Sequence, residues 1–262
     1  EWDCIFREFK EDKTAQETYL DFLRSLLKDK NYIEMCYMTG ILPIKKYGTH
    51  SALNMFDEIS MTQSKPLANY MGFTEEEVSN LCRKHNVDYQ KMKDWYDGYH
   101  MTDTISTFSP RSVVAAISKH DFSNYWTKTE SFEALKIYID LNFDGLKDNI
   151  IQMMAGKEIY IDTSSFENDM STFRSKDDVL TLLIHLGYLG CNQKDQTCYI
   201  PNKEVSDSFF TSIKNSNWDA TTKAIQNSRN LLDATFNMNE TKVADYIEPV
   251  SYTHLTLPTT PY

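Results

Sequence analysis

The chain has 262 residues, of which 41% are hydrophobic and 13% aromatic, and its 27 basic and 38 acidic residues give a formal net charge of −11. This apolar content excludes a disordered chain and is enough for one large domain or two small ones. The acidic charge disfavours non-specific nucleic-acid binding because it repels phosphate backbones, and the absence of any run of 18 apolar residues predicts no membrane span.

The first stretch of the chain has the order acidic cluster, helix, buried strand. It opens with Glu1-Trp2-Asp3 and lacks an initiator methionine, which we interpret as a cut inside a longer gene. A helix is predicted over residues 15–28, because apolar side chains recur on one helical face. The apolar run Tyr32–Met38 then predicts a strand buried on both faces of a parallel sheet.

Thr39-Gly40 ends this predicted strand and is the first candidate site. A hydroxyl residue at the carboxyl end of such a strand lies where open α/β sheets bind their ligands, and the alternative is that Thr39 only starts a turn. Lys45 and Lys46 follow closely and are candidates for contact with a nucleotide. The alternative for these two lysines is a solvated surface pair, since charged residues are mostly exposed.

Three helices are predicted next, and each has a start or stop signal. Thr74 and Glu77 form a capping box before the first helix, Gly98 ends the second, and Ser109-Pro110 supplies the N-cap and first residue of the third. The aromatic cluster Trp95–Tyr99 has two interpretations, a base-stacking platform or part of a core. Aromatic residues at helical spacing usually fill a core, which favours the second interpretation.

The second half of the chain predicts a helix, a β-hairpin and another helix, preceded by a polar boundary near residues 162–174. Ser175 begins the first helix and Asn202 caps the last, with strands predicted at Tyr188–Cys191 and Thr197–Ile200. This order is winged-helix-like, and winged helices often bind DNA. The last helix starts with mostly acidic and serine residues rather than the basic residues that read DNA, which favours a packing or interdomain role.

The five cysteines are an odd number and mostly follow apolar patterns, which favours reduced core residues in a cytoplasmic protein. Cys191 and Cys198 flank the predicted hairpin, a position from which they could approach each other. Two sulfurs with no nearby histidine make a poor zinc site, because structural zinc normally takes four ligands. No metal site is therefore predicted.

Several short motifs together resemble the predicted AAA-ATPase-like family of bacterial proteins, in which an ATPase region precedes a PD-(D/E)XK nuclease-like domain. The resemblance covers nearly everything up to about Glu248. It rests on these segments: Glu1-Trp2-Asp3, Tyr37–Ile44, Ser51–Asn54, Trp95–Tyr99, Tyr125-Trp126 and His185–Tyr188. The resemblance implies that the helices between residues 63 and 165 form a lid over a nucleotide site.

The resemblance also implies catalytic roles for two residues. Glu1 would be the Walker B glutamate that orients and deprotonates the attacking water, and Thr39 would be the residue that senses the γ-phosphate. Arg7 and Arg111 are candidates for an arginine finger by residue type alone. The intact protein would use ATP and Mg²⁺, would reach nucleic acid through the nuclease-like domain, and would form a homo-oligomeric ring as AAA relatives commonly do.

The glycine-rich phosphate loop G-x-x-x-x-G-K-[ST] occurs nowhere in the sequence, and the magnesium-binding aspartate would precede Glu1. Without the backbone cradle and its lysine, the β- and γ-phosphates have no binding site, so this chain is not expected to hydrolyse ATP. The nuclease carboxylates and lysine would lie beyond its other end.

The last predicted helices are residues 219–236 and Glu240–Ile247, and the chain is expected to leave the helix at Pro249. Residues 250–262 contain no Lys, Arg, Asp or Glu and resemble a translated transposon-adapter sequence from library preparation. We therefore expect them to be foreign to the fold. The predicted regions are an ATPase-core end (1–62), a lid-like region (63–165), a winged-helix-like linker (166–249) and this tail (250–262).

The sequence thus predicts a mainly α fold with an α/β remnant. The leading functional hypothesis is a fragment of an AAA-type ATPase that regulates a nuclease-like domain. The alternatives are a non-catalytic protein-interaction module and a DNA-binding winged-helix module.

Overall fold

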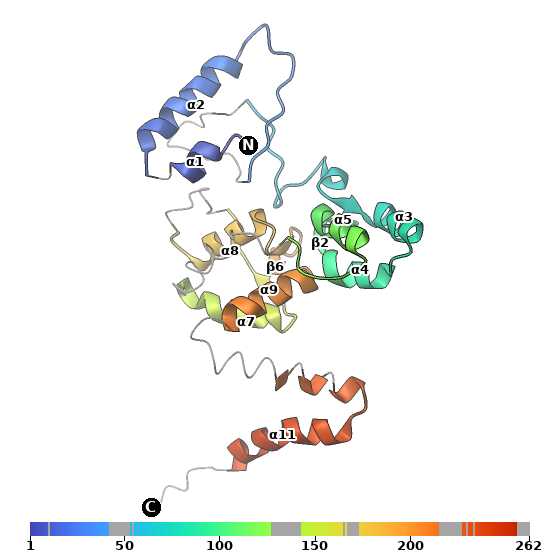
Figure 1. Cartoon of the computed structure of the whole chain (residues 1–262). Coiled ribbons are helices and arrows are strands. Elements are labelled where there is room, and N and C mark those ends of the chain that lie inside the picture. The colour runs from blue at the N-terminus through green and yellow to red at the C-terminus, as the bar shows by residue number, and fades with distance from the viewer. Residues whose placement is uncertain are drawn as a thin grey trace, which may run out of the picture. The chain divides into compact units, whose positions relative to one another are not determined.

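The computed structural model describes residues 1–9, 11–41, 53, 55–126, 143–164, 166, 173–214, 227, 228, 230–232 and 234–255 (Figure 1). They belong to two units, residues 1–208 and 209–262, and each unit is described by itself. The described part is mainly helical and contains two small antiparallel sheets. Among these residues no helix combines the length and apolar character needed to cross a membrane.

The first unit begins with two helices, α1 (Cys4–Glu8) and α2 (Lys13–Leu27). Asp12 caps α2 by accepting a hydrogen bond from the Ala15 amide at 2.9 Å. The inner face of α2 carries Leu20 and Leu23, which pack with Trp2 and Leu53 in a small apolar core. The predicted helix over residues 15–28 is confirmed.

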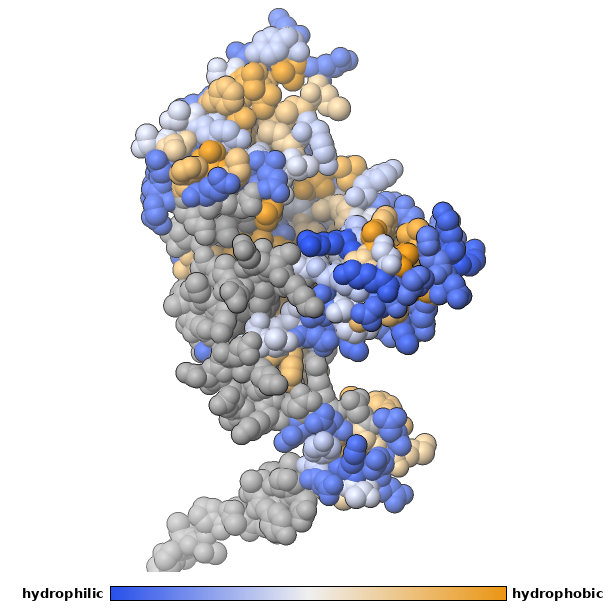
Figure 2. All heavy atoms as spheres, in the orientation of Figure 1, coloured by the Kyte–Doolittle hydropathy of each residue, from blue (hydrophilic) through white to orange (hydrophobic). Residues whose placement is uncertain are grey.

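The predicted strand Tyr32–Met38 is wrong for this chain. The segment has no strand assignment, and the exposed fractions of Tyr32, Met35 and Tyr37 are 69%, 85% and 77%. A buried parallel strand needs a hydrogen-bonded neighbour and a covering layer on each face, and the described residues supply neither. Figure 2 shows apolar surface over the part of the molecule that holds α2 and this segment.

Seven short elements follow in the lid-like region. They are η1 (Ala68–Tyr70), β1 (Phe73–Thr74), α3 (Glu75–His85), α4 (Tyr89–Tyr96), β2 (Tyr99–Thr102), β3 (Ile105–Phe108) and α5 (Pro110–Lys119). The three strands form an antiparallel sheet in the order β1-β3-β2. Its three helices were predicted, whereas the sheet was not.

The helices of this region begin and pack as the sequence predicts. Thr74 and Glu77 form the capping box of α3, with the Thr74 amide donating to Glu77 Oε2 at 2.8 Å. Pro110 is the first residue of α5. Tyr96 is completely buried in the apolar core, which confirms the core interpretation of the aromatic cluster Trp95–Tyr99 over the base-stacking platform.

The remainder of the first unit contains the predicted helix, hairpin and helix. Its elements are η2 (Phe143–Gly145), α7 (Leu146–Met154), β4 (Ile159–Tyr160), α8 (Lys176–His185), β5 (Gly190–Asn192), β6 (Thr197–Tyr199) and α9 (Lys203–Lys214). β4 adds to the hairpin to give an antiparallel sheet in the order β4-β6-β5. α9 continues past Ser208 into the second unit.

α8 is the most deeply buried helix of this region. Ser175 and Asp178 form its capping box, with the Arg174 amide also donating to Asp178 Oδ2 at 2.8 Å. Every residue from Asp178 to Ile184 is buried. A helix buried on all sides belongs to the core and presents no continuous face to a partner.

The second unit, described by itself, contains helical segments between residues 227 and 236 and the helix α11 (Glu240–Leu255). α11 runs through Pro249, so the expected end of the helix at that proline is wrong. An interior proline removes one backbone hydrogen bond and crowds the carbonyl four residues earlier, and α11 continues through Pro249 despite this cost. Residues 215–226 and 256–262 lie outside the described part.

Candidate functional site

The structure brings the segments of the two predicted catalytic residues together. The amide of Trp2 donates a hydrogen bond to the carbonyl oxygen of Thr39 at 2.8 Å. The amide of Ile41 donates to Asp3 Oδ2 at 2.9 Å. The backbone contact thus joins Thr39 to the residue that follows Glu1, 37 positions away along the chain, and both Glu1 and Thr39 are exposed.

Gly40 is required for this contact by its size. A Cβ atom added at residue 40 would lie 2.4 Å from Trp2 Nε1 and 2.6 Å from Trp2 Cδ1. The Trp2 ring is buried and belongs to the core beneath α2, so it cannot simply move aside. Thr39 is therefore followed by a glycine, the residue type that lets the Trp2 indole pack against the backbone at residue 40.

The other predicted site residues are not brought to this edge by any described contact. Lys45 and Lys46 lie outside the described residues. Arg7 lies in α1, and Arg111 lies exposed in the first turn of α5.

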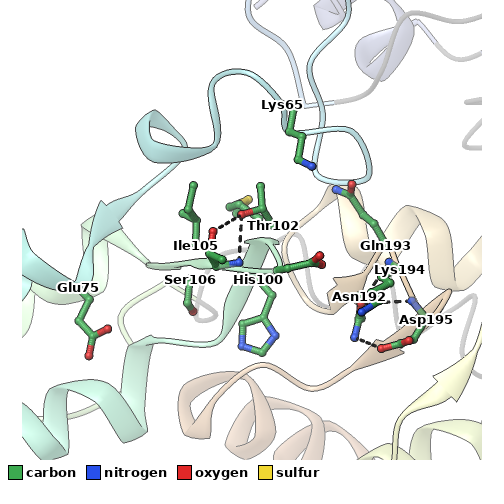
Figure 3. A pocket seen from close by; sticks show the side chains of 13 residues that line it. Lys65, Glu75, His100, Thr102, Ile105, Ser106, Asn192, Gln193, Lys194 and Asp195 are labelled. Atoms are coloured by element: carbon green, nitrogen blue, oxygen red, sulfur yellow. Dashed lines mark hydrogen bonds between the residues drawn. The ribbon is translucent and has the colours of Figure 1, made fainter.

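A polar pocket of about 630 Å³ lies between the β2–β3 hairpin and the turn that joins β5 to β6 (Figure 3). The side chains of Lys65 and Gln193 point toward one another across it. The side-chain amide of Asn192 donates to Asp195 Oδ2 at 2.7 Å, which ties two of the lining residues to their own turn. Sequence patterns could not reveal this pocket, because its two hairpins are about 90 residues apart.

The lining of the pocket does not assemble a catalytic pair. His100 and Ser106 are register partners on β2 and β3, but the Ser106 hydroxyl donates to Asp97 Oδ1 at 2.7 Å. The His100 ring packs against the Tyr199 ring, with centroids 5.3 Å apart. The Ser106 hydroxyl is therefore bonded to Asp97, which does not line the pocket, and among the described residues it makes no hydrogen bond to His100.

Cys191 and Cys198 approach each other as the sequence predicts. They are directly opposite in the β5–β6 hairpin, and both are buried free thiols. Burial raises the pKa of Cys191 to about 11 and that of Cys198 to about 12, because a thiolate is poorly solvated there. Within the described ranges no three His, Cys, Asp or Glu residues form a group that could hold a metal ion.

No family model matches the chain, and no solved structure matches it. An uncharacterized protein in the vnfD 5′ region of Azotobacter chroococcum mcd 1 is 26% identical over 110 residues. The aligned stretch is 41% of this chain and 21% of that protein, so the chain spans about a fifth of this relative's length.

Proposed function

We propose that the chain is the part of an AAA-type ATPase that follows the Walker B strand, and that the intact protein uses ATP binding and hydrolysis to regulate an attached nuclease-like domain. The observation that carries this proposal is the hydrogen bond from the Trp2 amide to the Thr39 carbonyl, at 2.8 Å. It supports the proposal because a Walker B glutamate and a sensor residue must come from neighbouring segments to act on one phosphate.

Each residue has a defined role in this proposal. The Glu1 carboxylate would orient and deprotonate the attacking water, and the Thr39 hydroxyl would donate to the γ-phosphate. Asp3 supports both, since its carboxylate holds the Ile41 amide and so fixes the backbone on either side of Gly40. In this proposal Glu1 and Thr39 act at the γ-phosphate. The sequence contains no phosphate loop that would bind the β-phosphate.

The experiment uses the full-length gene product and the substitution Glu1→Gln. The amide keeps the size of the side chain but cannot accept the proton of water, so hydrolysis is expected to fall at least about 100-fold while ATP binding is retained. Glu8→Gln, at an exposed position on α1, is the matched control and should hydrolyse ATP at the wild-type rate. Unchanged turnover in Glu1→Gln would refute the proposed role.

DNA binding is the second candidate, and the strand order β4-β6-β5 beside α8 favours it because winged helices have a comparable sheet and wing. The burial of Asp178–Ile184 opposes it, since α8 offers no free face to a DNA groove. Titration of the chain with duplex DNA at low and high salt tests this candidate. Salt-sensitive binding would support it, and no binding at 50 mM salt would remove it.

A non-catalytic interaction module is the third candidate, favoured by the exposed apolar residues of the segment 32–41 and of the second unit. A full-length gene product that contains no phosphate loop would remove the ATPase proposal and support this candidate.

A further inference from the structure

Two parts of the first unit meet at a polar joint that the proposed chemistry does not use. We call residues 73–126 the lid body and residues 146–208 the hairpin body. Tyr99, on β2 of the lid body, donates its hydroxyl hydrogen bond to the Gly187 carbonyl at 2.9 Å. Tyr199, on β6 of the hairpin body, donates to the Gly98 carbonyl at 3.0 Å. Each body therefore places a buried or partly buried tyrosine hydroxyl on a backbone carbonyl of the other.

The two backbones touch at Gly98 and Pro201. Gly98 has a φ of +105°, and a Cβ added there would lie 2.0 Å from the Pro201 carbonyl oxygen. The side-chain amide of Asn202 donates to the Asp97 carbonyl at 3.0 Å, while its oxygen accepts from the Val205 amide as the cap of α9. The start of α9 is thus fixed directly against the turn after α4.

Glu204 lies at the centre of this joint. It is only 1% exposed, and its carboxylate comes from the first turn of α9. One oxygen accepts from the Ser112 hydroxyl at 2.7 Å, and the other accepts from the amides of Tyr125 and Trp126 at 2.5 and 2.7 Å. A buried carboxylate is costly unless donors compensate it, and here three donors from the lid body do so.

The chain that leaves α5 is also held against the turn after α8. The Trp126 ring packs on the Tyr188 ring, with centroids 4.9 Å apart and planes inclined by 41°. A Cβ on Gly187 would lie 3.3 Å from the Trp126 ring. Tyr125-Trp126 therefore reaches the hairpin body through both its amides and its indole.

We propose that Glu204 is a latch that makes the lid body and the hairpin body one rigid unit, so that a displacement of the lid body moves the start of α9 with it. The latch joins α5 and the segment after it to the helix that continues along the chain beyond Ser208. This role is independent of the proposed ATPase function and holds whatever moves the lid body.

Hydrogen exchange of the 262-residue chain tests the latch without nucleotide. In the wild type, the amides of β2, β5 and residues 125–126 should become exposed in one common opening and exchange with similar protection factors. Glu204→Ala removes all three bonds, and protection at all three places should fall by about tenfold or more. Glu76→Ala, an exposed acid on α3, is the matched control and should leave protection unchanged.

A second variant keeps the test decisive if Glu204→Ala does not fold. Ser112→Ala removes one of the three bonds and should lower protection at β2, β5 and residues 125–126 in parallel, by a few-fold. Two results would overturn the latch. One is faster exchange confined to residues 125–126 in either variant, and the other is separate opening of the two bodies in the wild type.

Discussion

Gly40 gives the most direct test at the scale of single residues. Gly40→Ala places a Cβ 2.4 Å from the Trp2 ring nitrogen, so the indole must leave its buried position and the core with Leu20 and Leu23 must loosen. We expect a loss of about 2–3 kcal/mol of unfolding free energy, as for other overpacked cores. Denaturant unfolding, followed by the red shift of tryptophan fluorescence, measures it.

A double-mutant cycle identifies the cause of that loss. Trp2→Leu removes the ring that the new Cβ would meet, so Gly40→Ala should cost much less in the Trp2→Leu background than in the wild type. Equal costs in both backgrounds would mean that the indole contact does not require glycine at residue 40.

His185 makes the stability of the first unit depend on pH. Its ring packs on Phe166, with centroids 5.7 Å apart, and burial lowers the pKa of His185 to about 4 from the usual 6.5. Between these values the unfolded chain binds a proton that the folded chain does not, so stability is complete above pH 6.5 and falls as the pH drops toward 4.

The free energy of unfolding is expected to fall by about 2 kcal/mol between pH 7.5 and pH 5. This is because pH 5 lies about 1.5 units below the pKa of His185 in the unfolded chain, and each unit is worth about 1.4 kcal/mol. His185→Gln should remove this part of the pH dependence, whereas His85→Gln, at an exposed position, should retain it. Denaturant midpoints at the two pH values measure the effect. An unchanged pH dependence in His185→Gln contradicts it.

At the scale of elements, two glycines with positive φ distinguish the cost of backbone strain from the cost of a steric clash. Gly98 and Gly156 both have positive φ, but a Cβ at Gly98 meets the Pro201 carbonyl, whereas one at Gly156 meets no atom within 4 Å. Gly156→Ala should cost about 1–2 kcal/mol, the strain of a left-handed residue. Gly98→Ala should cost at least about 2 kcal/mol more, measured by thermal unfolding, because β2 and the start of α9 must separate.

The burial of the five thiols predicts which of them react. Cys82, Cys191 and Cys198 are buried, whereas Cys4 and Cys36 are partly exposed. Because the thiolate is the reactive form and burial raises the pKa of all three buried thiols, a disulfide reagent at pH 8 should modify only Cys4 and Cys36 rapidly. Denaturant should expose all five. Rapid modification of Cys191 in the native chain would contradict this packing.

Short sequence motifs predicted the helix starts that depend on neighbouring residues alone. The capping boxes at Thr74–Glu77 and Ser175–Asp178 begin α3 and α8 as expected, because a cap depends only on residues three apart. The β2–β3 hairpin was missed, since its strands have four residues each and pair by contacts that sequence periodicity does not record. The strand at Tyr32–Met38 failed because an apolar run forms a buried strand only beside neighbours.

The candidate site was predictable only in part. The sequence singled out Glu1 and Thr39 through the family resemblance, whereas the Trp2–Thr39 hydrogen bond joins residues 37 positions apart and has no local signal. Glu204 was not recognised, because it lies in a polar stretch that reads as an exposed helix start. Its donors, Ser112, Tyr125 and Trp126, are 78 to 92 residues away, and no local pattern signals such a contact.

In the whole molecule, different parts of the chain have different proposed roles. The exposed residues Glu1 and Thr39 form the proposed nucleotide site. The joint around Glu204 fixes the lid body to the hairpin body. α9 leads from that joint into the second unit. The acidic net charge of −11 disfavours non-specific nucleic-acid binding by this chain, because it repels phosphate backbones.

We propose that Glu1 and Thr39 belong to a nucleotide site, and sequencing the coding DNA upstream of Glu1 in the source genome is the sharpest test. We predict a glycine-rich G-x-x-x-x-G-K-[ST] loop after a strand, followed later by four apolar residues and an aspartate immediately before Glu1. An upstream sequence with neither feature would contradict the claim, and Glu1 and Thr39 would then be structural residues of an interaction scaffold.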